Sequence, residues 1–194
     1  MNKKDMEVRK KIFINKLHLF GPTIRSLNEA EIDWMLAGSG CLYLLGNDRI
    51  PDDADIFLKD NIHDAADELF KIKSFIYKSD VESVRNSNPE GSHDMQLTSH
   101  LKINVGGKEY GLSITDEMMK KRIKTEIDGE PVWLLAPEDV LIVKALLQRG
   151  SEVGKSDLED IQNFMKIYPN IDKDYIRSRI TSLGANQRIG EIFF

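Results

Sequence analysis

The chain has 194 residues and a mass of 22.2 kDa, which fits one large domain or two small ones. Hydrophobic residues make up 41% and charged residues 30%, ordinary values that exclude disordered, fibrous and low-complexity proteins. The 27 basic and 32 acidic residues give a formal net charge of -5, so no overall field draws a polyanion to the surface.

The sequence lacks the signals of membrane insertion and secretion. No stretch approaches the roughly 20 apolar residues of a membrane-spanning helix, and the start, MNKKDMEVRKK, lacks a signal peptide's apolar middle. We therefore expect a cytoplasmic protein without membrane contacts. The single cysteine, Cys41, cannot form an internal disulfide, and its apolar neighbours indicate a buried side chain, so we expect no redox or zinc chemistry.

The first half of the chain alternates between helical and strand-like segments. Residues 5–20 form an amphipathic pattern that predicts a helix ended by Gly21-Pro22, and residues 23–31 predict a second, short helix. The apolar residues 34–36 predict a strand, followed by a tight turn at Ala37-Gly38-Ser39-Gly40 and a helix over 41–45. A second buried strand starts at or near Asp53 and runs to Leu58.

The second half contains a loop, two hairpins and several helices. We expect a helix over 62–72, a long loop over 83–94, and strands over 95–105 and 108–115 that are joined at Gly106-Gly107. A further hairpin over 123–135 turns at Asp128-Gly129, and helices follow over 138–148, 156–167 and 172–180. This order predicts an α+β fold, with a mixed-sheet core over 1–135 and a C-terminal helical region packed on it over 136–194.

Two basic runs are candidates for local contact with nucleic acid. They are Lys3, Lys4, Arg9, Lys10 and Lys11 near the start, and Lys120, Lys121, Arg122 and Lys124 later. Such runs more often form solvated helix faces, and we favour that interpretation.

Asp53 and Asp55 are the strongest candidates for chemistry. On a strand, residues two apart point to the same face, about 6 to 7 Å apart, so both carboxylates can reach one divalent cation. Mg²⁺ prefers such oxygen ligands and is commonly held by one or two carboxylates together with substrate phosphates. An Asp-x-Asp alone is weak evidence, because acids also occur at solvated strand ends.

The Gly38-Ser39 turn strengthens that interpretation. It follows an apolar strand and opens a helix, where free backbone N–H groups can bind phosphate oxygens and Ser39 adds a hydroxyl donor. Thirteen residues separate Ser39 from Asp53, enough for one helix and a return loop. We therefore expect the phosphate-binding turn and the carboxylates to face each other.

These residues resemble the signature of the polymerase-β-type nucleotidyltransferase superfamily, in which a hydrophobic strand leads to Gly-Gly or Gly-Ser and then to Asp-hydrophobic-Asp. The matching segments are Ala37-Gly38-Ser39, Arg49 and Asp53-Ala54-Asp55-Ile56-Phe57. The chain is most similar to the small branch of AbiEii-type toxins and minimal nucleotidyltransferases. That branch's Ser-Pro-Glu-Asp-Leu, Lys and Lys-Asp-x-x-Asp-Ile pattern resembles Ala136-Pro137-Glu138-Asp139, Lys144, Arg149 and residues 155–161.

The resemblance implies a Mg²⁺-dependent nucleotidyltransferase that moves a nucleoside monophosphate from a nucleoside triphosphate to a hydroxyl of RNA, a protein or a small molecule. It implies that Asp53 and Asp55 are catalytic metal ligands and that Gly38 and Ser39 hold the triphosphate. It also implies a third acid on a later strand, which would help to activate the acceptor hydroxyl.

The third acid is where the sequence departs from the family pattern. At the expected position, the strand Tyr110-Gly111-Leu112-Ser113-Ile114 carries Ser113, unless the register differs and Glu109 or Asp116 substitutes. Serine cannot act as a carboxylate ligand or base near neutral pH. This leaves a second hypothesis: a non-catalytic nucleotide- or partner-binding module of the same fold. A toxin-antitoxin component is compatible with either hypothesis.

Two cationic residues have two interpretations each. Arg49 either binds substrate phosphates or bridges Asp52 or Asp53, because guanidinium geometry suits both partners. Lys144 either extends toward a phosphate or forms a structural ion pair with Asp157 or Asp160.

Overall fold

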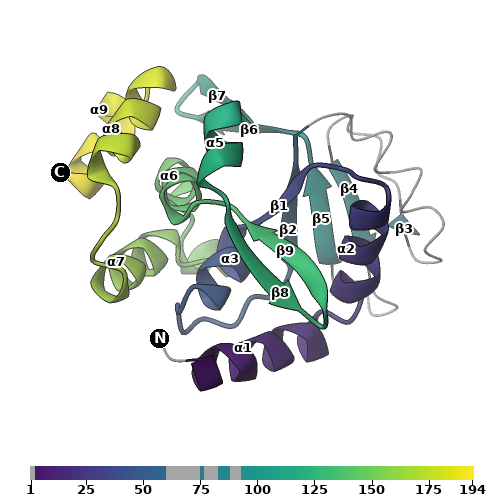
Figure 1. Cartoon of the computed structure of the whole chain (residues 1–194). Helices are drawn as coiled ribbons and strands as arrows, with labels where there is room; N and C mark the ends of the chain where they lie inside the picture. Colours follow the sequence, from purple (N-terminus) through teal and green to yellow (C-terminus); the bar gives the residue numbers. More distant parts are fainter. Residues whose placement is uncertain (1–2, 60–74, 77–82, 88–92) are drawn as a thin grey trace.

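The computed structural model describes residues 3–59, 75–76, 83–87 and 93–194. In these residues the chain forms a mixed seven-stranded sheet and a separate two-stranded sheet, with helices at both ends of the sequence (Figure 1). The predicted α+β class is confirmed. The helix predicted over 62–72 lies outside the described residues.

Strands predominate in the middle of the described chain, between helices at both ends. In chain order, the elements are α1 (Lys3–Lys16), α2 (Phe20–Glu29), β1 (Trp34–Ala37), α3 (Gly38–Leu44), β2 (Ala54–Leu58), β3 (Phe75–Ile76), β4 (Ser83–Ser87), β5 (His93–Thr98), β6 (His100–Val105), β7 (Lys108–Ser113), α5 (Asp116–Lys121), β8 (Ile123–Ile127), β9 (Glu130–Leu134), α6 (Pro137–Leu147), a 3₁₀ turn (Ser151–Val153), α7 (Asp157–Ile167), α8 (Lys173–Ser182) and α9 (Asn186–Phe193).

The large sheet has the strand order β3-β4-β5-β2-β1-β9-β8. Its centre is mixed, because β2 runs antiparallel to β1 and parallel to β5. The register pairs Asp55 of β2 with Ala37 on one side and with Gln96 on the other. The end of β1 and the start of β2 therefore lie at the same edge of the sheet.

The N-terminal helices cover the β1 side of the sheet through aromatic packing. Phe20 lies edge-on to Phe13 of α1 at 4.9 Å between ring centroids and edge-on to Trp34 of β1 at 6.5 Å. The prediction that Gly21-Pro22 ends the first helix is wrong, since α1 ends at Lys16 and Pro22 lies in the first turn of α2. Proline is tolerated there because the first N–H groups of a helix have no intrahelical partner.

The loop predicted over 83–94 is also wrong. This segment contains β4 and the start of β5, which pair with each other in antiparallel fashion. The single strand predicted over 95–105 is two strands, β5 and β6, and Ser99 alone separates them. The chain thus leaves the large sheet at Thr98 and enters the two-stranded sheet at His100.

Both predicted hairpin turns are confirmed. Gly106 and Gly107 have φ values of 59° and 78° between β6 and β7, and Asp128 and Gly129 have φ values of 51° and 80° between β8 and β9. Two successive positive φ values give the tight hairpin turns that match strand twist. The short helix α5, between the hairpins, was not predicted.

Helix α6 is the centre of the C-terminal half and is buried along most of its length. It contacts α3 on the core side and α7, α8 and α9 on the other (Figure 1). One hydrophobic cluster includes residues on both sides of position 135, among them Leu36, Leu134, Leu141 and Ile161. The division into 1–135 and 136–194 stays a prediction.

Cys41 lies fully buried in this cluster, and its Sγ donates a hydrogen bond to the carbonyl of Leu135 over 3.2 Å. Burial raises the pKa of its thiol, which suits a packing role and not a nucleophile. In the described part of the chain, no helix is both long enough and apolar enough to cross a membrane.

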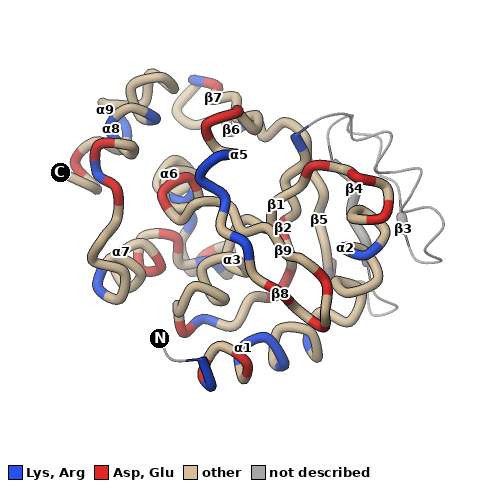
Figure 2. The backbone as a smooth tube through the Cα atoms, in the orientation of Figure 1, with Lys and Arg blue, Asp and Glu red and all other residues tan. Residues whose placement is uncertain are grey.

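Part of each basic run is paired with acids. In the first run and its helix, Arg9 pairs with Asp48 and Lys16 with Asp52. In the second, Lys121 pairs with Asp172 and Arg122 with Asp33, at the junction of α5 and β8 where Figure 2 shows a basic stretch next to acidic segments. This pairing favours a solvated surface over a nucleic-acid site.

Candidate active site

One cavity of about 410 Å³ lies between the sheet and α6, with a wall from β6. All six residues that the sequence singled out line it: Gly38, Ser39, Arg49, Asp53, Asp55 and Lys144. They come from four separate segments of the chain, so the fold brings together residues up to 106 positions apart, from Gly38 to Lys144.

Gly38 and Asp55 meet where β1 ends. Gly38 has φ +59°, a conformation that residues with a Cβ rarely adopt, and a Cβ at this position would lie 1.9 Å from Oδ2 of Asp55. Both the backbone and the neighbouring carboxylate therefore require glycine here. The turn and the carboxylate are adjacent, as the spacing along the chain predicts.

Asp53 and Asp55 form a pair of acids at the start of β2. Asp53 precedes the strand and is not part of it, but both residues line the cavity and both are half-buried. Burial, and next the negative charge of Asp53, raise the pKa of Asp55 from 3.8 to about 6. Lysine and arginine side chains nearby only partly offset this repulsion.

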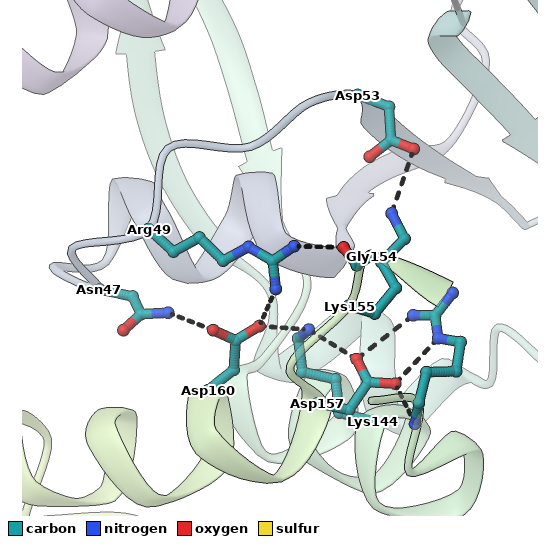
Figure 3. A network of polar contacts seen from close by, with 9 residues as sticks. Asn47, Arg49, Asp53, Lys144, Gly154, Lys155, Asp157 and Asp160 are labelled. Carbon is teal, nitrogen blue, oxygen red and sulfur yellow. Dashed lines mark hydrogen bonds and ion pairs between the residues drawn. The ribbon is translucent and has the colours of Figure 1, made fainter. Parts of the chain in front are cut away.

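Lys144 belongs to a buried ion-pair network (Figure 3). Its Nζ lies 3.0 Å from Asp157 Oδ1 and 2.8 Å from Asp160 Oδ2, and its side chain is only 6% exposed. Arg149 completes the network by donating to Asp157 from its backbone N over 3.0 Å and from Nε over 2.8 Å. The predicted ion pair is therefore present with both acids, and together these residues tie α6 to α7.

Arg49 joins the same network from the opposite side. Its Nη1 donates to Asp160 Oδ2 over 3.4 Å and its Nη2 to the carbonyl of Gly154 over 3.2 Å. The predicted alternative, a bridge to Asp52 or Asp53, is wrong: Asp52 pairs with Lys16, and Asp53 lies 3.9 Å from Lys155. Arg49 keeps one edge on the cavity.

Ser113 does not occupy the position of a third acid. It is exposed on β7, in the two-stranded sheet, and does not line the cavity; its Oγ lies 2.6 Å from Nδ1 of His100. The substitutes considered, Glu109 and Asp116, do not line the cavity either. The expected strand was the wrong one, because β5 and not β7 runs alongside β2.

The comparison of sequences decides the family. A profile described as "Nucleotidyl transferase of unknown function (DUF2204)" matches residues 17–189. The chain belongs to this family. No curated protein matches it.

Solved structures share the nucleotidyltransferase fold. The antibiotic-resistance factor ANT(2″)-Ia superposes with a TM-score of 0.56 at 12% identity, over 89% of this chain and 97% of that one. A candidate nucleotidyltransferase from Thermotoga maritima has a TM-score of 0.50 at 15% identity, over 71% of this chain and 87% of that one. An antigenic nucleotidyltransferase-like protein from Paracoccidioides brasiliensis has a TM-score of 0.48 at 15% identity, over 89% of this chain and 90% of that one. The first two likenesses establish the fold alone.

Within the nucleotidyltransferase fold, β5 carries an acid that sequence reasoning assigned to a loop. Asp94 directly precedes Met95, which pairs with Ala54, and Asp53 directly precedes Ala54. The paired residues of β2 and β5 begin at Ala54 and Met95, so Asp53 and Asp94 each directly precede the paired segment, at a point where the pairing of β5 with β4 is irregular. Its signal in the sequence was the run Asp94-Met95-Gln96-Leu97, which alternates between polar and apolar residues as a half-buried strand does.

Two cationic residues of this nucleotidyltransferase are site residues that sequence reasoning missed. Arg149 and Lys155 both line the cavity, although the sequence points to them only within the downstream motif. They flank a connection between α6 and α7 whose glycines suggest a phosphate-binding loop but which follows a helix instead of a strand. Their place beside Asp53 depends on the packing of α6 and cannot be read from local sequence.

Part of the cavity lining is apolar. Val140, Val143 and Leu147 of α6 form a stripe at helical spacing, and Leu101 of β6 and Phe57 of β2 complete this part. The cavity lining thus combines charged groups with a set of apolar side chains. A ligand with a charged part and a flat or apolar part fits this combination.

Proposed function

We propose that this nucleotidyltransferase transfers a nucleoside monophosphate from a nucleoside triphosphate to a hydroxyl group, with Mg²⁺ bound by Asp53 and Asp55. The observation that carries the proposal is the cavity in which two acids face the Gly38-Ser39 turn. Four cationic side chains of the described ranges also line this cavity. The apolar side chains in its lining suit the base of the nucleotide or the acceptor.

The donor set fits a hard divalent cation. Both candidate ligands are carboxylates, and the raised pKa of Asp55 results from burial and from repulsion by Asp53, which a cation between them relieves. Within the described residues, no three His, Cys, Asp or Glu side chains are grouped to hold a metal ion, so the proposed site would combine these two carboxylates with substrate phosphates. Such a cation, when bound, neutralises charge on the phosphates and aligns the reacting groups.

We assign the remaining roles from position. Ser39 and the backbone of Gly38 bind the triphosphate, and Arg49 contacts it from the edge that it keeps on the cavity. We assign the third carboxylate, which would accept the proton of the attacking hydroxyl, to Asp94, because Asp94 directly precedes Met95, the partner of Ala54 in β2. Lys144 acts by holding α6 to α7, since two carboxylates already engage it.

The alternative of a non-catalytic binding module rested on Ser113. Because Ser113 lies on a different sheet, that reason no longer applies. The similarity to AbiEii-type toxins, a toxin-antitoxin role and the identity of the acceptor stay predictions. RNA, a protein and a small hydroxyl compound are the acceptor classes to compare.

Transfer from α-labelled nucleoside triphosphates tests the proposal. The assay offers pooled RNA, a protein mixture and small hydroxyl compounds with Mg²⁺, and it compares Asp53→Asn, Asp55→Asn and Asp94→Asn with the wild type. We expect Mg²⁺-dependent transfer in the wild type and its loss in all three variants. Asp52→Asn is the matched control, because Asp52 is an exposed neighbouring acid that pairs with Lys16 outside the cavity.

Two results would overturn these assignments. Activity retained by both Asp53→Asn and Asp55→Asn would refute the metal-ligand role. Activity retained by Asp94→Asn alone would refute only the third carboxylate.

A further inference from the structure

Among the described residues, four cationic side chains line the cavity, and they differ in how firmly acids hold them. Lys144 contacts two buried carboxylates within 3.0 Å, and Arg149 contacts Asp157 through its backbone and its side chain. Removing either from its partners would leave a buried charge uncompensated. Lys144 and Arg149 are therefore fixed parts of the structure.

Lys155 is held much more loosely. Its Nζ lies 3.9 Å from Asp53 Oδ2, too long for a hydrogen bond, and the two side chains are 30% and 28% exposed. Figure 3 shows Lys155 extending from the α6–α7 connection toward Asp53. A half-exposed pair at this distance is weak, so its ammonium group can exchange partners at little cost.

The backbone that carries Lys155 is fixed. The connection is closed at its base by hydrogen bonds in both directions between Arg149 and Asp157, each 3.0 Å long. The N–H of Lys155 donates to the carbonyl of Gly150 over 3.0 Å, and the carbonyl of Gly154 accepts from Arg49. Rotation of the Lys155 side chain alone can therefore move its charge within the cavity.

We propose that Lys155 is an exchangeable phosphate-binding residue, which neutralises Asp53 in the free protein and moves to the triphosphate when a metal-nucleotide complex binds. This inference rests on the proposed function. It assigns to Lys155 two successive partners, a carboxylate and then a phosphate oxygen, both of which suit an ammonium group.

The charges around the cavity support this exchange. Arg49, Lys144, Arg149 and Lys155 are balanced by four acids: Asp53, Asp55, Asp157 and Asp160. A divalent cation on Asp53 and Asp55 leaves Lys155 without its acid, whereas the other three cations keep Asp157 and Asp160. The phosphate oxygens of a nucleotide are then the acceptors that restore the balance.

Lys155→Met tests the exchange, because it should raise the affinity for a metal ion alone and lower the affinity for a metal-nucleotide complex. Titration calorimetry with Mn²⁺ alone should show binding about 2- to 5-fold tighter than in the wild type, since a competing cation is gone. Titration with a metal complex of a non-hydrolysable triphosphate should show binding about 10-fold weaker or worse. Lys155→Arg should retain most of the nucleotide affinity.

Lys166→Met is the matched control, because Lys166 is an exposed lysine of α7 that does not line this cavity. It should leave both affinities unchanged. Thermal melting of each variant should match the wild type, which shows that the fold is intact.

The outcomes distinguish this inference from the function on which it rests. If Asp55→Asn abolishes Mn²⁺ binding but Lys155→Met leaves both affinities unchanged, or weakens both, the exchange is refuted and the metal site stands. If Mn²⁺ binding is absent or insensitive to Asp55→Asn, the proposed function fails and the exchange fails with it.

Discussion

Asp55 and Asp157 are two acids close to the same cavity whose surroundings are opposite. Burial would raise the pKa of Asp157, but hydrogen bonds from Arg149 and Lys144 lower it below its ordinary value. Burial together with Asp53 raises the pKa of Asp55 to about 6, and the cations nearby offset this only in part. The fold stabilises one carboxylate with its own cations and leaves the charge of the other only partly compensated.

The same contrast applies to the two lysines. Lys144 is 6% exposed and contacts two acids, whereas Lys155 is 30% exposed and approaches one acid at 3.9 Å. The ammonium group of Lys144, which maintains the structure, is fully paired with acids, whereas that of Lys155 is not. Substitutions of Asp55 or Lys155 should therefore change binding and activity, and substitutions of Asp157 or Lys144 should change stability.

The largest difference should appear in activity. Asp55→Asn should lower Mg²⁺-dependent transfer at least about 1,000-fold, because it removes a proposed metal ligand where charge must be neutralised. It should leave the unfolding midpoint unchanged or raised in metal-free buffer, because the repelled charge is gone. Initial rates and urea unfolding on one preparation measure both effects. A lower unfolding midpoint for Asp55→Asn would show that the charge of Asp55 stabilises the fold, as that of Asp157 does.

Lys144→Met should instead destabilise the fold. It leaves Asp157 and Asp160 buried with less compensation, at a cost of about 3–5 kcal/mol in the free energy of unfolding. Lys155→Met is the control and should cost less than about 1 kcal/mol. Equal losses of unfolding free energy in urea for the two variants would show that Lys144 does not contribute more to stability than Lys155.

Gly38→Ala tests the close approach of Asp55 to the turn. Gly38 and Gly106 both have φ +59°, but a Cβ meets Asp55 at 1.9 Å in the first and nothing within 4 Å in the second. Gly106→Ala should cost about 1 kcal/mol, the backbone penalty, and Gly38→Ala about 2 kcal/mol more, with loss of activity. Equal stability losses would mean that Asp55 does not occupy that space.

The smallest effect concerns pH. The folded-state pKa of Asp55, about 6, exceeds its ordinary value of 3.8, so the folded chain binds this proton more tightly. The resulting stability is fully present below about pH 4 and is lost as the pH rises through about 6. Relative to Asp55→Asn, the wild type should lose about 1–2 kcal/mol over this range in metal-free buffer. If the difference in unfolding free energy between the wild type and Asp55→Asn did not change with pH, the raised pKa of Asp55 would be contradicted.

Features that depend on neighbouring residues were predictable from sequence. The Gly106-Gly107 and Asp128-Gly129 turns follow from the φ values that these residues tolerate. The approach of Gly38 to Asp55 follows from a strand, a turn and a short helix in close succession. In the turns the relevant residues are adjacent, and Gly38 and Asp55 are joined by only one short helix and a return loop.

Features that depend on pairing between distant segments of the chain were not predictable from the sequence. The segment Ser83–Ser87 is polar and lacks the alternation of a strand, and it becomes β4 because β5 pairs with it. Which strand lies beside β2 depends on topology, so Ser113 was chosen on β7, although β5 is the strand that pairs with β2. Arg49 and Asp160 are 111 residues apart, and only the packing of α7 brings them together.

The break between β5 and β6 has a mechanical consequence. Thr98 and Leu101 both line the cavity, yet they belong to different sheets, with Ser99 as the single residue between the two strands. The two-stranded sheet contacts α6, and its Ile103, Tyr110 and Leu112 belong to the hydrophobic core, so Leu101 is held in the cavity wall by core packing and not by the large sheet. The width of the cavity at Leu101 therefore depends on residues of the core that lie far along the chain from Asp53 and Asp55.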